Sequence, residues 1–309
     1  MKPKLYFAPM EGVATYTYRN LHNKMFGMCD EYFAPFIVPT ENERISIKNL
    51  RDILPENNDI RVVPQVLFSS GSAFVDFSKK IKELGYDNVN INFGCPSGTV
   101  VKKKRGAGAL LDTDFIDKLL DYVFEKSDIK ISVKCRTGFY SHDEFSEILE
   151  VFNKYPLEKL IIHPRVREDF YKGNPNMDVF DMAYKNTNLK LCYNGNIYSV
   201  LDYNNISEKY NNLDGIMIGR GAIKNPAIFR EIKGGKKLET EELISFTKAL
   251  KEKYMILLKN EDYTLRRLKE IWMYMLENFP DEKKILKAVK KSSKLTDLEN
   301  AISNLPNLE

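Results

Sequence analysis

Apolar and polar positions alternate along the first 220 residues or so in a pattern that predicts strands separated by helices. Stretches such as Phe74–Leu84 and Phe115–Phe124 carry apolar residues at helical spacing. Between such stretches lie short apolar runs, each about the length of one buried strand. These runs are Leu5–Met10, Cys29–Phe36, Val62–Leu67, Asn88–Asn92, Ile129–Lys134, Leu160–His163, Leu189–Tyr193 and Gly215–Ile218.

Strands that alternate with helices indicate a parallel sheet built from βαβ crossovers. Eight such units over roughly 230 residues match the usual size of a (β/α)8 barrel. The alternative is an open doubly wound sheet, which carries a glycine-rich phosphate turn after its first strand. Here the first strand is followed by Pro-Met-Glu-Gly at residues 9–12, which is not such a turn. We therefore predict an α/β fold, a (β/α)8 TIM barrel.

The pattern changes after Pro226, where no further strand is predicted. A Gly/Lys-rich joint, IKGGKK, occupies residues 232–237, and the segments Thr240–Lys259, Tyr263–Phe279 and Asp281–Lys291 follow with helical periodicity. The sequence therefore predicts a barrel over residues 1–235 and a small all-helical domain over residues 236–309.

The composition says more about the cellular compartment of the protein than about its function. The net charge of +4 does not by itself indicate a nucleic-acid partner, so any such partner must be argued from local clusters. The four cysteines contain no C-x-x-C pair, which argues against a zinc or thioredoxin-like site; we predict no bound metal. No apolar run approaches the length of about 18 residues that a membrane span needs. We expect a reduced, cytoplasmic protein with no export signal and no membrane association.

Polar or glycine residues follow most of the predicted strands. In parallel barrels the chemistry lies at these carboxyl ends. Any one of these residues could be a satisfied core group, but a ring of buried polar groups is costly without a function. The residues concerned are Pro9, Met10, Glu11, Gln65, Asn90, Asn92, Cys95, Lys134, Arg136, His163, Arg165, Asn194, Gly195, Asn196, Gly219, Arg220 and Gly221.

The last two strand ends predict a phosphate site. Asn194-Gly195-Asn196 and Gly219-Arg220-Gly221 are glycine-containing turns after the seventh and eighth strands, where barrels commonly bind phosphate. Arg220 would add a forked cation. The competing interpretation, a simple strand-to-helix turn, is serious for either turn alone but weaker for the pair.

The segment Asn88–Leu111 places a thiol at a strand end. Cys95 lies between Gly94 and Pro96, and the cationic run Lys102–Arg105 follows it. This position predicts an exposed reactive cysteine rather than a small buried apolar one. A nucleophile and a proton donor are both open at this point. The cationic run is either a solvated surface loop or a clamp for a phosphate backbone.

Seven ordered blocks of sequence resemble the tRNA-dihydrouridine synthases, which are flavin-dependent RNA-modifying enzymes. The resemblance runs from Ala8 to about Phe229 and is weaker in the C-terminal helices. The blocks are APMEGVATYTYR (8–19), PQV (64–66), NINFGCPSGTVVKKKRGAGALL (90–111), VKCRTGF (133–139), IIHPRVREDFYKG (161–173), YNGNI (193–197) and DGIMIGRGAIKNPAIF (214–229).

The resemblance implies an FMN-bearing barrel joined to a helical domain, with a basic cleft for tRNA between them. It implies that NADPH reduces FMN, that hydride passes from the flavin to C6 of a uracil base, and that Cys95 protonates C5 as the catalytic residue. We expect a monomer.

The resemblance also assigns residues to the cofactor and to RNA. The expected FMN contacts are Pro9, Met10, Glu11, Gln65, Asn92, Lys134, His163, Asn194, Gly195, Asn196, Gly219 and Arg220. The expected RNA contacts are Lys102, Lys103, Lys104, Arg105, Arg136, Arg165 and Arg167, with Tyr171 in the same substrate-side block.

Three positions depart from the family pattern. Pro164 replaces the glycine of the usual His-Gly-Arg, Asn196 replaces the acid of Asn-Gly-Asp, and Glu11 replaces a common alanine.

Alternative functions are a small-molecule flavin oxidoreductase resembling the dihydroorotate dehydrogenases, the same reaction on ribosomal RNA, and RNA binding without turnover. Cys95, Lys134 and His163 are all present, which argues against the last of these.

Overall fold

The computed structural model describes residues 2–39, 47–279, 282–303 and 305–308. Within them, nine strands form one all-parallel sheet in the order β3-β2-β1-β9-β8-β7-β6-β5-β4. The strands are β1 Lys4–Phe7, β2 Glu31–Phe33, β3 Val62–Val63, β4 Gln65–Val66, β5 Asn88–Phe93, β6 Lys130–Arg136, β7 Leu160–His163, β8 Leu191–Tyr193 and β9 Gly215–Ile218.

The predicted third strand is divided in two at Pro64. β3 pairs with β2, whereas β4 pairs with β5, so the chain changes partner at the proline. A proline has no N–H to donate to the ladder, but its carbonyl still accepts from the Asn90 N–H at 2.8 Å. The sheet therefore closes on itself at this point, and the predicted barrel with eight strand positions is confirmed.

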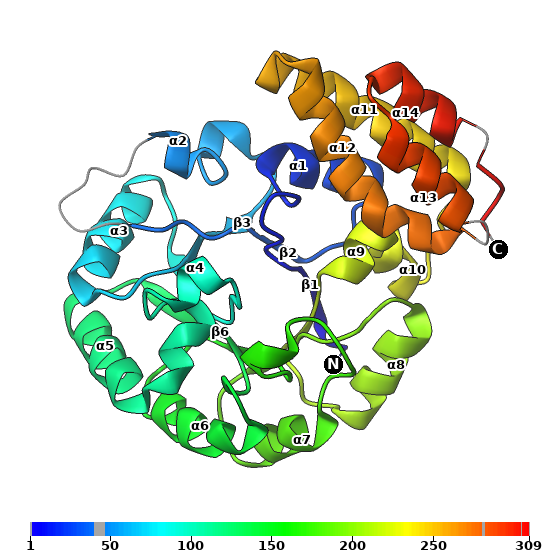
Figure 1. The fold of residues 1–309 in the computed structure, drawn as a ribbon. Helices are drawn as coiled ribbons and strands as arrows, with labels where there is room; N and C mark the ends of the chain where they lie inside the picture. Colours follow the sequence, from blue (N-terminus) through cyan, green and yellow to red (C-terminus); the bar gives the residue numbers. More distant parts are fainter. Residues whose placement is uncertain (1, 40–46, 280–281, 304, 309) are drawn as a thin grey trace.

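Helices surround the barrel as a ring when it is viewed along its axis (Figure 1). The α-helices of the described chain, including those outside the ring, are α1 Tyr16–Met25, α2 Ile47–Leu50, α3 Gly71–Glu83, α4 Gly98–Val101, α5 Thr113–Lys126, α6 Phe145–Asn153, α7 Met177–Lys185, α8 Val200–Lys209, α9 Arg220–Lys224, α10 Ile228–Ile232, α11 Thr240–Leu258, α12 Glu261–Met275, α13 Glu282–Lys291 and α14 Leu295–Ile302.

Side chains alternate between the inside and the outside of the barrel along each strand, as the pleat requires. On β1, Leu5 and Phe7 belong to the large apolar cluster between strands and helices, whereas Tyr6 points inward. The inward apolar layer consists of Tyr6, Ala8, Phe33, Val63, Ile161, Cys192 and Met217. This layer fills the centre of the described barrel, which leaves room for a cavity at its ends.

The amino-terminal end of the barrel is closed by a buried ion cluster. The Lys159 ammonium lies 3.0 Å from the Glu31 carboxylate and 3.8 Å from that of Asp214. The Tyr6 hydroxyl donates to Asp214 at 2.6 Å and lies 3.2 Å from the Lys159 ammonium. Each of these three charges therefore has an internal partner.

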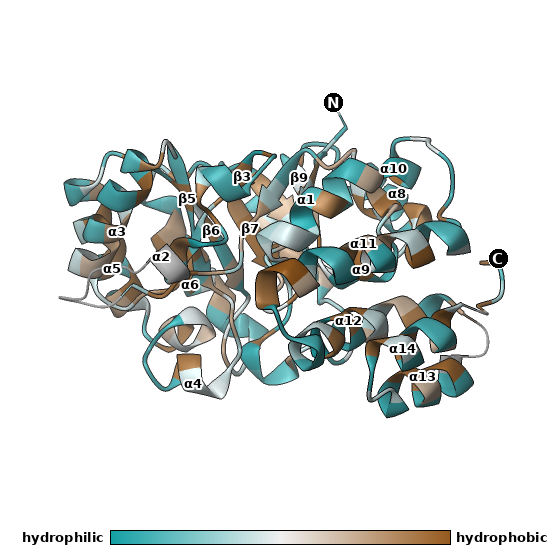
Figure 2. Ribbon diagram, turned by 90° about the horizontal axis from the view of Figure 1, so that it is seen from above, coloured by the Kyte–Doolittle hydropathy of each residue, from teal (hydrophilic) through white to brown (hydrophobic). Residues whose placement is uncertain are grey.

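The C-terminal helices α11–α14 pack outside the ring beside α1 and α9 (Figures 1 and 2). Phe246 of α11 meets Tyr18 of α1 edge to face at 5.2 Å between ring centroids, and both belong to the same apolar cluster as the barrel shell. The Asn278 amide donates to the carbonyl of Lys224 at 2.6 Å. The helices predicted from Thr240 and Tyr263 are present, whereas α14 was not predicted.

Two sequence predictions about the C-terminal region stay open. The boundary of the helical domain near residue 235 stays a prediction, and the predicted helix start at Asp281 lies outside the described residues. None of the described helices is long and apolar enough to cross a membrane.

Candidate active site

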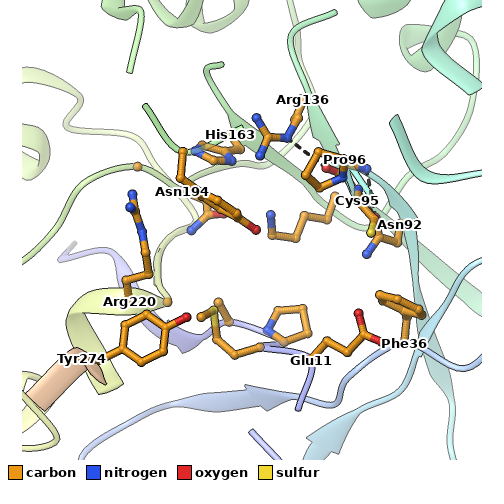
Figure 3. A pocket seen from close by; sticks show the side chains of 18 residues that line it. Glu11, Phe36, Asn92, Cys95, Pro96, Arg136, His163, Asn194, Arg220 and Tyr274 are labelled. Atoms are coloured by element: carbon orange, nitrogen blue, oxygen red, sulfur yellow. Dashed lines mark hydrogen bonds between the residues drawn. The ribbon is translucent and has the colours of Figure 1, made fainter. Parts of the chain in front are cut away.

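A cavity of about 290 Å³ opens at the carboxyl ends of the strands, a volume at the low end for small-molecule sites. It is lined by Ala8, Pro9, Met10, Glu11, Phe36, Asn92, Gly94, Cys95, Pro96, Lys134, Arg136, His163, Tyr171, Asn194, Gly195, Gly219, Arg220 and Tyr274. In Figure 3, Asn92 and Cys95 lie on one side of the cavity, and Arg220 and Tyr274 lie on the opposite side. The structure thus gathers most of the predicted strand-end residues around one space.

A ladder of buried amides supports the Cys95 side. The Gln65 amide donates to Asn90 at 2.7 Å, and the Asn92 amide donates to Gln65 at 2.8 Å. The Asn92 side-chain oxygen then accepts from the backbone N–H groups of Gly94 and Cys95, both at 2.9 Å. Gln65 does not line the cavity; its position orients Asn92, which in turn fixes the start of the Cys95 loop.

The Cys95 thiol is half-buried in the cavity wall. Burial raises the pKa of Cys95, and the Glu11 carboxylate raises it further, while the Ser97 backbone, Arg136 and Lys134 oppose the rise. The thiol is therefore protonated at neutral pH. A protonated thiol is suited to donating a proton and poorly suited to acting as a thiolate nucleophile. Of the two roles that the sequence left open, the raised pKa favours the proton donor.

The cationic run Lys102–Arg105 does not line the cavity. The Arg105 guanidinium donates to the Ser69 hydroxyl at 3.2 Å, and the Lys104 ammonium lies 3.7 Å from Asp112. Lys102, Lys103 and Lys104 are exposed. They follow α4, which projects on the side away from the amino terminus, as α13 does (Figure 2). The run thus lies outside the cavity, on the side where the strands end.

Lys134 and His163 offer hydrogen-bond donors from adjacent strands. Burial lowers the pKa of Lys134 to about 8, and the charge of Arg136 adds to the effect. Burial also lowers the pKa of His163 well below its ordinary value, together with Lys134 and the surrounding arginines. The neutral imidazole accepts from the Arg165 guanidinium at Nε2, at 2.8 Å, so its own proton resides on Nδ1.

The opposite side of the cavity is built from the two glycine turns. The guanidinium groups of Arg165 and Arg220 both donate to the Asn196 side-chain oxygen, at 3.1 Å each. Asn196 therefore does not line the cavity but holds the two arginines. Asn194 is anchored by its amide to the Met217 carbonyl at 2.8 Å. At Gly219 a Cβ would lie 3.2 Å from the Met10 sulfur, so a side chain there would crowd the cavity wall.

Two arginines predicted to contact RNA are instead buried among backbone carbonyls. Arg136, 1% exposed, donates to the carbonyls of Gly94, Val166 and Phe170 at 2.9, 2.8 and 2.6 Å. Arg165, also 1% exposed, donates to the carbonyls of Lys172 and Gly173 in addition to His163 and Asn196. A guanidinium so occupied holds loops together, which favours a positioning role for both arginines; their contact with RNA stays a prediction.

Arg167 links two loops at the rim. Its Nε donates to the carbonyl of Pro96 at 3.2 Å, and its guanidinium also pairs with Glu168. The segment that follows β7 is thereby tied to the loop that carries Cys95.

Sequence reasoning missed several residues of the cavity wall. Phe36 ends the predicted second strand, so the strand-end rule could have included it. Tyr274 belongs to α12, whose pattern indicates only an amphipathic helix, and no local signal shows that a helix so far along the chain reaches the site. Tyr171, by contrast, belongs to the block that the resemblance places near the substrate; it lines the cavity, and the guanidinium groups of Arg136 and Arg220 lie 5.3 and 5.0 Å from its ring centroid.

Within the described residues, no group of three or more His, Cys, Asp or Glu side chains is placed to hold a metal ion. The described cavity wall carries Lys134, Arg136 and Arg220 against one carboxylate, that of Glu11, and this excess of cations suits an organic anion.

Comparison with known proteins identifies a family model that spans nearly the whole chain and relatives that cover about three quarters of it. The family model described as "Dihydrouridine synthase (Dus)" matches residues 6–307. The tRNA-dihydrouridine synthase B of Proteus vulgaris is 32% identical over 253 residues, which cover 79% of this chain and 74% of the relative. A probable tRNA-dihydrouridine synthase of Staphylococcus aureus (strain COL) is 28% identical over 241 residues, covering 74% of this chain and 71% of the relative.

Solved structures with similar folds are more distant in sequence. A morphinone reductase mutant in complex with tetrahydroNAD superposes with a TM-score of 0.54 at 10% identity, covering 76% of this chain and 87% of that one. The histamine dehydrogenase of a Rhizobium species gives a TM-score of 0.55 at 12% identity, covering 75% and 45%. At these identities the likeness supports the barrel fold alone.

Proposed function

Because this chain belongs to the dihydrouridine synthase family, we propose that it reduces uridines in tRNA to 5,6-dihydrouridine, with FMN as the bound cofactor and NADPH as the reductant. The observation that carries the detailed proposal is the arrangement of one cavity, in which a protonated thiol at Cys95 faces a cationic wall at Arg220 (Figure 3).

The residues present fit FMN. Arg220 and the turns at Asn194–Gly195 and Gly219 form a cationic, glycine-containing wall suited to the phosphate. Lys134 and the Nδ1–H of His163 provide donors for the polar edge of the flavin ring. Because Gly219 has no side chain, nothing from this position crowds the cavity wall between these groups; a Cβ there would lie 3.2 Å from the Met10 sulfur.

When bound, reduced FMN supplies the hydride that is added to C6 of the uracil ring. Cys95 then donates its proton to C5, so the C5–C6 double bond becomes a single bond and the cysteine is left as a thiolate that solvent reprotonates. Burial keeps the thiol protonated before this step. Asn92 contributes by fixing the backbone of Gly94 and Cys95.

The substrate base must leave its stack to enter the cavity. The cost of unstacking is offset by contacts elsewhere on the RNA, for which the exposed Lys102, Lys103 and Lys104 are the candidates.

The test of the function is to map dihydrouridine in tRNA and ribosomal RNA of a strain that lacks the gene. We expect dihydrouridine to be lost from defined tRNA positions and regained when the wild-type gene is restored. Unchanged tRNA dihydrouridine would contradict the proposal, and loss from ribosomal RNA alone would change the substrate.

The role of Cys95 is tested with Cys95→Ala in the purified protein. We expect FMN binding and flavin reduction by NADPH to stay near wild type, while dihydrouridine formation falls by about 10²-fold or more, the usual contribution of a positioned proton donor. Cys29→Ala is the matched control, since Cys29 is also half-buried but its thiol donates to the carbonyls of Leu5 and Glu31, away from the cavity. Turnover of Cys95→Ala near wild type would rule out the proton-donor role.

A further inference from the structure

An aromatic ring stands at the rim of the active site on a strained backbone. Phe170 follows the short helical turn Arg167–Asp169, and the residue is 41% exposed. Its φ of 50° and ψ of −98° lie outside the regions that residues with a Cβ normally occupy. Such strain persists only where surrounding contacts impose it, and it concentrates at functional sites.

The contacts that impose this conformation come from the site itself. Arg136, buried in the cavity wall, donates to the Phe170 carbonyl at 2.6 Å, and the Phe170 N–H donates to the Arg167 carbonyl at 3.1 Å. The Arg167 guanidinium lies 4.9 Å from the centroid of the Phe170 ring and 5.3 Å from that of Phe139. The ring is therefore held in place before any ligand arrives.

Phe170 and Tyr171 are consecutive in the chain but lie on different sides of the cavity wall. Tyr171 lines the cavity, whereas Phe170 does not. Arg167 also donates to the carbonyl of Pro96, next to Cys95. The exposed ring of Phe170 is thus fixed, through one arginine, to the loop that presents the proposed proton donor.

We propose that Phe170 stacks on the RNA base adjacent to the uridine that enters the cavity. This inference rests on the proposed function. An exposed aromatic face backed by a guanidinium, beside a cationic cavity, is the chemistry that binds unpaired nucleobases. Extruding the uridine leaves its neighbour without a stacking partner, and the Phe170 ring provides a replacement.

Kinetics with tRNA test this role. Phe170→Ala and Phe170→Leu should both lower kcat/KM for tRNA by about 5- to 100-fold, the usual effect of removing one base–aromatic stack. Phe170→Tyr should restore most of the activity, because it keeps the π-face that leucine lacks. Phe170→Gly tolerates the positive φ, so a loss equal to that of alanine separates stacking from backbone strain. FMN content and NADPH-dependent flavin reduction should not change.

Tyr122→Ala is the matched control. Tyr122 lies on α5, outside the cavity wall, and is exposed to the same 41%. Its removal should leave kcat/KM unchanged.

A spectroscopic measurement reports the stack directly. Once the modified uridine is mapped, 2-aminopurine is placed on either side of it, and its fluorescence, which stacking quenches, is followed as the protein binds. One flanking position should stay quenched with wild type and Phe170→Tyr but brighten with Phe170→Ala and Phe170→Leu.

The outcomes distinguish the two proposals. A wild-type protein that forms no dihydrouridine would refute the function. An active wild type with Phe170→Ala and Phe170→Leu at wild-type kcat/KM would overturn the stacking role alone. So would a loss of activity in which the 2-aminopurine signal is the same in wild type and Phe170→Leu.

Discussion

The two ends of the barrel treat buried charge in opposite ways. At the amino-terminal end, Lys159 is paired with Glu31 and Asp214, and Tyr6 bonds both the lysine and Asp214. At the carboxyl end, Lys134 and Arg220 line the cavity, and among the described residues its wall carries one carboxylate, that of the exposed Glu11.

The charges at the amino-terminal end stabilise the fold, whereas those at the carboxyl end are placed to bind a ligand. A buried charge with an internal partner stabilises one packing of the chain, whereas a buried charge without one is costly until a ligand provides the partner. The lowered pKa of Lys134, to about 8, reflects that cost. The carboxyl end is therefore prepared for an anion, and the amino-terminal end needs none.

The largest effect is expected from a matched pair of lysine substitutions. Lys159→Met leaves two carboxylates unpaired at the closed end, where the lysine side chain is 8% exposed, and should lower the free energy of unfolding by about 3–5 kcal/mol. Lys134→Met removes a buried cation that burial already disfavours and should leave that free energy equal or higher, while FMN affinity falls. Chemical denaturation and FMN titration measure the two effects.

Two outcomes of these lysine substitutions would contradict the contrast between the barrel ends. A Lys134→Met protein that unfolds as easily as Lys159→Met, or a Lys159→Met protein that stays folded and loses FMN affinity, would mean that the two ends do not differ as described.

The next effect concerns the phosphate. Arg220→Met should weaken FMN binding by about 10- to 100-fold, the usual value of one charge-assisted hydrogen bond. Riboflavin, which lacks the phosphate, is the control ligand, and its affinity should be similar for wild type and variant. Equal losses for both ligands in flavin-fluorescence titrations would place Arg220 at another part of the cofactor.

A smaller effect is expected from pH. With a pKa of about 8 in the free protein, Lys134 loses its proton as the pH rises through that value. Its charged form is the one that favours an electronegative ligand, so FMN affinity should fall as the pH rises from 7 to 9, by at most about tenfold. The fall should be absent in Lys134→Met; a fall of the same size in that variant would assign the titration to another group.

The smallest effect is expected outside the cavity. Replacing Lys102, Lys103 and Lys104 by glutamine should weaken tRNA binding and reduce the slope of log affinity against log salt by roughly 0.7–0.9 for each phosphate that the protein no longer neutralises. FMN affinity should not change, because these residues do not line the cavity. An unaltered salt slope would identify the run as an ordinary solvated surface.

Local pattern was sufficient for much of this protein. Short apolar runs separated by segments with helical periodicity predicted all eight strand positions, because the strands of a parallel barrel are buried on both faces and appear as continuous apolar stretches. The exception is Pro64, where one apolar run forms both β3 and β4. The polar residues that end the strands could be predicted as a site because parallel strands bring their carboxyl ends to one edge.

The sequence by itself therefore determined the barrel, the end at which the cavity lies and the position of Cys95 in its wall. Only the tertiary structure decided which cations are bonded to other parts of the protein and which are exposed to solvent. Arg136 and Lys102 are both cations in the sequence, but one is bonded to three carbonyls and the other is exposed. The tertiary structure also brought Tyr274 to the cavity and set Phe170 at its rim. These outcomes depend on contacts between distant segments, which no local spacing encodes.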